Sequence, residues 1–180
     1  MTQTKPNVTN ATAPDLLNTL LGLQPDTLVA ELRARRPDVA RYTQGSYDAL
    51  LTPSHPADVG PDERALIALR VAHLTASQPL IEHYEQRLVA LGVPVATIAA
   101  AQHSPDSTVL TPRQVALLRH TDLLSNEPIA ATPAHLADLQ AVGLGAREIV
   151  TIAQLIAFLS FQVRLLAGLQ ALGQPFGEVA

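Results

Sequence analysis

Helix-start signals recur along this sequence and decide its fold class. In each signal a proline lies at the beginning of a run with many apolar residues, next to an acidic or hydroxyl side chain, which is typical of helix N-termini. The signals are Pro14-Asp15, Pro25-Asp26, Pro37-Asp38, Pro61-Asp62, Thr111-Pro112 and Thr132-Pro133. No segment alternates apolar and polar residues as a half-buried strand does. The sequence therefore predicts an all-α protein.

The start signals, together with glycines that mark helix ends, divide the chain into helices. The end signals are Gly92, Gly143, Gly145 and Gly173. The expected helices span 14–22, 25–35, 38–51, 61–76, 79–91, 94–101, 112–125, 133–142 and 146–172, with a loop at 52–60. Residues 1–13 are rich in Thr, Asn, Ala and Pro and lack the apolar core of a secretory signal, so they are predicted to be a disordered leader. Residues 14–180 are expected to form a single helical domain.

Two expected helices are apolar on almost every side. Residues 65–76 carry only Arg70 and His73 as strongly polar side chains, and 149–163 are equally apolar. Such a helix must be buried all round, and so short a chain cannot cover two of them, so a homo-oligomer is expected. The uncharged run between Glu148 and Arg164 is too short to span a bilayer, so a core helix is predicted there and no membrane partner.

Charge and composition argue against several classes of function. The net charge of −4 gives no general attraction to nucleic acid, which is not expected as a partner. The sequence has no cysteine, which removes disulfides, thiolate nucleophiles and cysteine-ligated metals. Four histidines lie in loops or beside charged residues and have no ligand spacing, so no metal and no cofactor are predicted. These four are His55, His103, His120 and His135. Without an export signal, a cytoplasmic location is the expectation.

The segment RALIALRVAHLTASQPLIEHYEQRLVALG, from Arg64 to Gly92, resembles the core helix pair of the alkylhydroperoxidase D and carboxymuconolactone decarboxylase family. The second half is similar in order and spacing, from Leu110-Thr111 through Asn126-Glu127-Pro128 to the AVGL and REIV segments. The last helix, FLSFQVRLLAGL, is similar to the closing helix of the peroxidase-related members. The resemblance covers about residues 48–173. It implies an alkylhydroperoxidase D-like multi-helix bundle that assembles as a trimer or hexamer.

The sequence departs from this family at the positions that carry its chemistry. Active members have a C-x-x-C pair, a His four residues after the second Cys and a Glu three turns upstream. One thiolate attacks peroxide and the other resolves the sulfenic acid, while the Glu and His move protons. The cysteine positions fall on Ser77 and Leu80, the His position on Tyr84 and the Glu position on Ala65. Thiol peroxidase activity is therefore not expected.

Two functions remain open at this point. The first is a catalytically degenerate relative that acts as an oligomeric scaffold or as the partner of an active relative. The second is a non-thiol enzyme or small-carboxylate binder in the relic pocket, with decarboxylase or lactone-type acid–base chemistry by His73, His83 or Glu82. A polar cavity beside His73 and Ser77 would favour the second function, whereas a pocket filled by apolar side chains would favour the first.

Five residues are candidates for the relic pocket: Arg70, His73, Ser77, Tyr84 and Arg164. Ser77 is expected to cap the following helix, or else to offer a binding hydroxyl, and His73 to lie one turn before it on the same face. Tyr84 is expected in the core with a partner for its hydroxyl. Arg70 and Arg164 each stand in an apolar helix, where a buried charge requires a partner. They are interpreted as members of structural ion pairs or as an anion-binding clamp.

Overall fold

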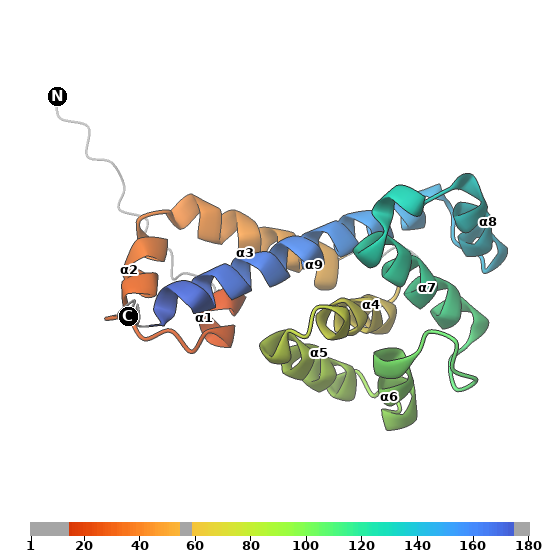
Figure 1. The fold of residues 1–180 in the computed structure, drawn as a ribbon, viewed down its shortest axis with the longest axis horizontal. Coiled ribbons are helices and arrows are strands. Elements are labelled where there is room, and N and C mark those ends of the chain that lie inside the picture. Colours follow the sequence, from red (N-terminus) through yellow and green to blue (C-terminus); the bar gives the residue numbers. More distant parts are fainter. Residues whose placement is uncertain (1–14, 55–58, 175–180) are drawn as a thin grey trace, which may run out of the picture.

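The computed structural model describes residues 15–54 and 59–174, which fold into helices joined by short turns (Figure 1). The helices are α1 (Leu16–Leu20), α2 (Leu28–Ala34), α3 (Pro37–Leu51), α4 (Pro61–Leu74), α5 (Gln78–Ala90), α6 (Val95–His103), α7 (Pro112–Asn126), α8 (Pro133–Ala141) and α9 (Ala146–Gly173), with a short 3-10 helix, η1 (Pro128–Ala130). No strand occurs within these ranges, and the predicted all-α class is confirmed. The predicted leader at 1–13, His55 and residues 175–180 lie outside the described residues.

From α3 onward the helices begin within one residue of the predicted position, because proline and capping side chains satisfy or remove the free amides of the first turn. Helices α1 and α2 begin later than predicted, and Thr27 caps α2. Thr111 and Gln114 form the expected capping box: the Thr111 hydroxyl accepts from the Gln114 amide at 3.2 Å, and the Gln114 side chain accepts from the Thr111 amide at 3.0 Å. Gly92 and Gly143 adopt φ values of 75° and 85° just after α5 and α8, as helix ends require. Gly145 was predicted to end a helix. It is instead the N-cap of α9, where its amide donates to Glu148.

Helix α4 forms the centre of the fold. It packs against α5, α6, α7 and α9, and every residue from Arg64 to Ala72 is buried. The expectation that the apolar stretch 65–76 is covered on all sides is therefore confirmed as far as Ala72, whereas His73 and Leu74 are half-buried and Thr75 and Ala76 are exposed. Helix α9 runs along one side of the molecule beside α3, with α1 and α2 near its C-terminal end and α7 and α8 near its N-terminal end (Figure 1).

Helix α9 is less completely covered than the sequence predicted. Only 39% of its most apolar stretch is buried within the chain. Val150 and Phe161 are 56% and 45% exposed, and Arg164 is also exposed. By length and composition alone it is the one helix in the described ranges that could cross a membrane. Core helices of soluble proteins can have the same length and apolar composition, and α9 packs against α3, α4 and α7. This chain alone therefore does not bury α9 on every side, and the expectation that a subunit interface covers the rest stays a prediction.

Candidate functional site

Arg70 lies inside the core and is held by several partners at once. Its side chain forms a two-point ion pair with Asp122 on α7, with N–O distances of 2.6 and 2.7 Å. Its remaining nitrogen donates to the carbonyl oxygens of Gln102, at 2.8 Å, and Ala101, at 3.4 Å. The predicted structural ion pair is confirmed for Arg70. With its nitrogens occupied by Asp122 and the end of α6, Arg70 has little capacity left for a ligand.

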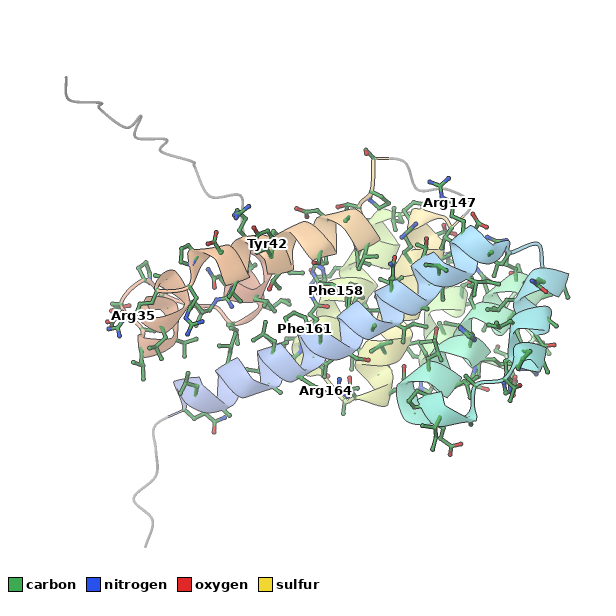
Figure 2. All side chains as sticks on the ribbon, turned by 90° about the horizontal axis from the view of Figure 1, so that it is seen from above. Arg35, Tyr42, Arg147, Phe158, Phe161 and Arg164 are labelled. Atoms are coloured by element: carbon green, nitrogen blue, oxygen red, sulfur yellow. The ribbon has the colours of Figure 1, made fainter. Side chains whose placement is uncertain are left out.

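Arg164 occupies a different environment, and the prediction that it is buried is wrong. Its side chain is exposed, and its one hydrogen bond in the structure is a long contact of 3.4 Å to the Ser160 carbonyl of its own helix. The sequence around Arg164 is as apolar as that around Arg70, but this part of α9 lies at the edge of the molecule (Figure 2). Arg70 and Arg164 therefore do not form an anion-binding clamp within this chain.

Ser77 and His73 are separated by a turn. Helix α4 ends at Leu74, and Ala76 has a left-handed φ of 51°, so Ser77 does not share a helical face with His73 as predicted. Ser77 is the N-cap of α5 by position, but its hydroxyl makes no capping hydrogen bond. His73 is half-buried with its Nε2 unpartnered. Burial lowers its pKa, and the charges on His103 and Arg70 lower it further against an opposing effect of Glu85.

Tyr84 belongs to a polar chain between α3, α5 and α9. Its hydroxyl donates to Gln162 at 2.7 Å, so the predicted core position with a hydroxyl partner is confirmed. The neighbouring His83 contacts the Tyr84 ring edge-on and bonds the Tyr47 hydroxyl at 2.9 Å. Burial raises the pKa of Tyr84 well above its usual value. The pKa of His83 is lowered by burial and by the nearby Arg87 charge. These side chains are neutral at neutral pH and fix the packing of three helices.

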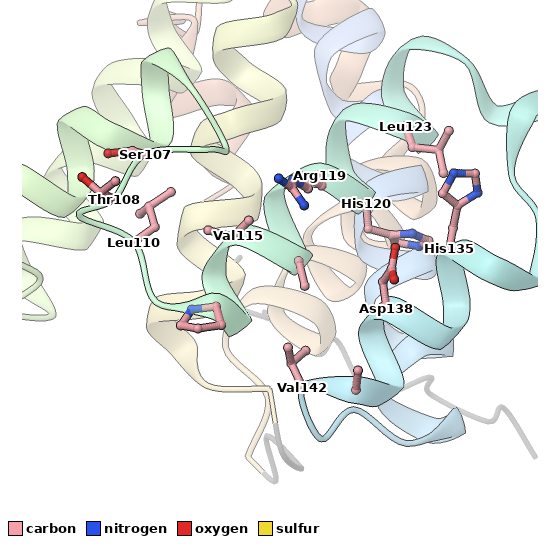
Figure 3. A pocket seen from close by; sticks show the side chains of 13 residues that line it. Ser107, Thr108, Leu110, Val115, Arg119, His120, Leu123, His135, Asp138 and Val142 are labelled. Atoms are coloured by element: carbon pink, nitrogen blue, oxygen red, sulfur yellow. The ribbon is translucent and has the colours of Figure 1, made fainter.

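Two pockets stand out in the described part of the chain, and neither is lined by any of the five candidate residues. One, of about 810 Å³, lies between the α1–α2 region and the end of α9. The other, of about 680 Å³, lies between α7 and α8 and contains His120 and His135 (Figure 3). Sequence reasoning considered these two histidines only as metal ligands. A sequence signal for the burial of His120 was available, because His120 lies between Leu118 and Thr121, which are on the buried face of α7.

No model of a known protein family matches the sequence, and the comparison with curated proteins finds no match. Solved structures do match. An uncharacterized peroxidase-related protein from Ralstonia eutropha JMP134, described as an alkylhydroperoxidase AhpD core, superposes with a TM-score of 0.70 at 18% identity, covering 92% of this chain and 87% of that one. An uncharacterized peroxidase-related protein from Silicibacter sp. TM1040 gives 0.68 at 16% identity over 78% and 72% of the two chains.

This chain has the alkylhydroperoxidase AhpD-like fold. A third structure with this fold is a cysteine-to-alanine variant of the debrominase Bmp8 in complex with 2,3,4-tribromopyrrole. It superposes with a TM-score of 0.67 at 18% identity, over 85% of this chain and 79% of that one. The architecture expected from the sequence resemblance is thus confirmed at the level of the fold.

Within this AhpD-like fold, three of the positions assigned to the family's reactive groups are closed off by packing. Ala65 and Tyr84 are completely buried, and Leu80 is 1% exposed. Only Ser77 has solvent access, and no nearby side chain among the described residues hydrogen-bonds its hydroxyl. A hydroxyl without a neighbouring base is a weak nucleophile. The side chains at these four positions pack the core or connect two helices, and they include no nucleophile–base pair.

Proposed function

We propose that this chain is a catalytically degenerate relative of the alkylhydroperoxidase D and carboxymuconolactone decarboxylase family that serves as an oligomeric helical scaffold. The observation that carries the proposal is the replacement of the family's four reactive residues. The residues at these positions, Ser77, Leu80, Tyr84 and Ala65, supply neither a thiol nor a general base. Leu80 and Ala65 have no reactive atom at all, and the Tyr84 hydroxyl is engaged with Gln162. A scaffold needs the fold and its surfaces but not the reactive groups.

The packing around these positions supports the same function. Leu80, Tyr84 and Ala65 belong to one continuous core cluster with the buried face of α9. A reacting molecule would have to displace core side chains, at a cost of several kcal/mol. The alternative, a non-thiol enzyme or small-carboxylate binder at His73 and Ser77, needs an open polar cavity there. The two pockets that stand out lie elsewhere, and Arg70 is already neutralised by Asp122.

The exposed side of α9 supplies a surface for assembly. Its exposed residues recur at helical spacing, and the apolar or small ones among them alternate with three polar side chains. The apolar or small residues are Val150, Ala157, Phe161, Gly168 and Ala171, and the polar ones are Arg147, Gln154 and Arg164. The Phe161 ring lies 6.2 Å from that of Phe158, and Tyr42 on the neighbouring α3 is 63% exposed (Figure 2). A face with exposed aromatic and small apolar side chains and some arginine is typical of subunit interfaces. We propose a homo-oligomer, a trimer or hexamer as the family resemblance implies, that resides in the cytoplasm and can take an active relative as partner.

The loss of activity is tested by a peroxidase assay. The purified protein is mixed with dithiothreitol and cumene hydroperoxide, and hydroperoxide loss is followed against a no-protein blank. We expect no turnover above the blank, because a serine hydroxyl has too high a pKa to act as a thiolate and cannot form the disulfide intermediate. Turnover that rises in proportion to protein concentration would overturn the assignment.

Assembly is tested separately by size-exclusion chromatography with light scattering. We expect the mass of a trimer or hexamer for the wild type and a lower mass for Phe161→Glu, which places a charge in the proposed interface. Val95→Glu is the matched control, because Val95 is 77% exposed on α6, away from α9. A monomeric wild type at micromolar concentration would contradict the oligomer. An unchanged mass for Phe161→Glu would contradict the α9 interface.

A further inference from the structure

The exposed residues of α9 form one straight stripe along the helix (Figure 2). From Arg147 to Arg164 every exposed residue lies on this stripe, with alternating spacings of three and four residues. These residues are Arg147, Val150, Gln154, Ala157, Phe161 and Arg164. The stripe continues with the same spacing to Gly168 and Ala171, over a length of about 36 Å. Such a spacing is the seam along which two α-helices pack side by side in a coiled coil, so the stripe fits another helix along its whole length.

The side chains of the stripe are complementary in size to those of a second α9 that runs in the opposite direction. A two-fold axis at the level of Leu159 places Ala157 of one copy opposite Phe161 of the other. The same axis places Val150 opposite Gly168, so each larger side chain meets a small residue, as close packing requires. The space at Gly168 is open within the described part of the chain, because no atom lies within 4 Å of where its Cβ would be.

The charges of the stripe favour the same direction. Arg164 of one copy is opposite the neutral Gln154 of the other, and the two Arg164 residues are about 15 Å apart along the helices, beyond the screening length of about 8 Å. Arg147 is opposite Ala171, in the last turn of the other α9, where the helix dipole is negative. A parallel pair would instead place Arg164 beside Arg164 and Arg147 beside Arg147.

Other antiparallel registers along the same stripe lose this match. A shift of seven residues in one direction would bring Arg147 of one copy against Arg164 of the other. A shift of seven residues in the opposite direction would bring Ala157 against Gly168, two small residues that leave a gap. The register centred at Leu159 also uses the full length of the stripe.

We propose that two copies of this chain associate through an antiparallel α9–α9 pair, centred at Leu159, with the stripe from Arg147 to Ala171 as its seam. This inference rests on the oligomeric scaffold proposed above and adds the direction and register of its contact. A two-fold contact joins chains in pairs, so a hexamer can contain it and a trimer cannot.

Cysteine cross-linking tests the direction and the register. The chain has no cysteine, so introduced thiols report the contact without background. Val150→Cys and Gly168→Cys are made singly and together, and each protein is treated with the short cross-linker bismaleimidoethane. In the antiparallel pair either residue is about 27 Å from its own copy, whereas Val150 faces Gly168. We expect cross-linked dimers from the double variant, and from the single variants no more than from Val89→Cys, a control exposed on α5.

Gln154→Glu tests the direction independently of the cysteine variants. It places a carboxylate opposite Arg164 at two symmetric positions, and we expect the dissociation constant from sedimentation velocity to fall about tenfold, or about threefold for each exposed ion pair. In a parallel pair the two carboxylates would face each other and weaken assembly. Gln86→Glu, at an exposed position on α5, is the matched control and should change nothing.

The outcomes separate this inference from the scaffold on which it rests. Cross-linking of either single variant, none in the double variant, or a dissociation constant that Gln154→Glu does not lower would overturn the antiparallel pair. A trimeric wild type would also overturn it and would leave the scaffold intact. A monomeric wild type would overturn both proposals.

Discussion

Helices α4 and α9 each contain an apolar stretch, and the two stretches have very different surroundings. Both stretches are apolar on almost every side; Arg70 lies within that of α4, and Arg164 directly follows that of α9. Helix α4 is enclosed by α3, α5, α6, α7 and α9, and its stretch from Arg64 to Ala72 is continuously buried. Helix α9 presents Phe161 and Arg164 to solvent along a side that no described helix covers.

The difference shows what an apolar sequence does and does not determine. Composition requires that an apolar helix be covered, but it does not say whether the same chain supplies the cover. Around α4 the cover comes from this chain, and the arginine is neutralised by Asp122. Along α9 this chain covers only one side and leaves Arg164 exposed. The contrast leaves α9 as the surface for assembly and α4 as the centre of the fold.

The largest expected effect comes from breaking the ion pair inside α4. Asp122→Ala leaves the Arg70 guanidinium buried without its carboxylate, and the free energy of unfolding is expected to fall by about 3 kcal/mol or more. Arg70→Met is expected to cost less, because the Asp122 side chain is 24% exposed and can be solvated, whereas that of Arg70 is 9% exposed. Urea denaturation followed by circular dichroism measures both.

Asp106→Ala is the matched control for this experiment. It removes the Arg119–Asp106 pair, whose side chains are 64% and 61% exposed, and it should cost at most about 1 kcal/mol. If Asp122→Ala cost no more than Asp106→Ala, Arg70 would not depend on its partner, and the description of α4 as a sealed core helix would be wrong.

The sequence predicted the helices well because their ends depend on local chemistry. A proline in the first turn, a capping threonine or a left-handed glycine acts within a few residues, so Thr111 and Gly92 could be interpreted without knowing the fold. The turn after Leu74 was missed because Ala76 takes a positive φ that favours glycine, and nothing in its side chain indicates this. The helix was consequently predicted to continue to residue 76.

The candidate site was harder to predict because it depends on contacts between distant segments. A buried arginine was expected to need a partner, but only the packing of α7 on α4 selects Asp122 as the partner of Arg70. The environment of Arg164 depends on what covers α9, and the sequence of that helix does not contain this information. The α7–α8 pocket needs two helices and a loop together, so no motif could have shown that His120 lies in it.

A smaller effect is expected where α9 contributes a polar group to the core. Tyr84→Phe removes the donor to the Gln162 side chain, which is 1% exposed, and should lower the free energy of unfolding by about 1–3 kcal/mol. The double variant with Gln162→Leu removes both polar groups and should be less destabilised than the sum of the two single changes. Tyr42→Phe, at an exposed tyrosine, is the control and should be neutral. Additive single changes would mean that the two side chains do not interact.

The smallest expected effect is at Arg164, and it tests the exposed side of α9 most directly. Arg164→Ala removes a side chain whose one hydrogen bond is a long contact within its own helix, so the free energy of unfolding should change by no more than about 0.5 kcal/mol. Benzoate, a small carboxylate, should not raise the melting temperature, because Arg70 and Arg164 form no joint anion site. A loss above about 1 kcal/mol would mean that the guanidinium is covered. If the loss disappears on dilution, the cover is another subunit, because only assembly depends on protein concentration.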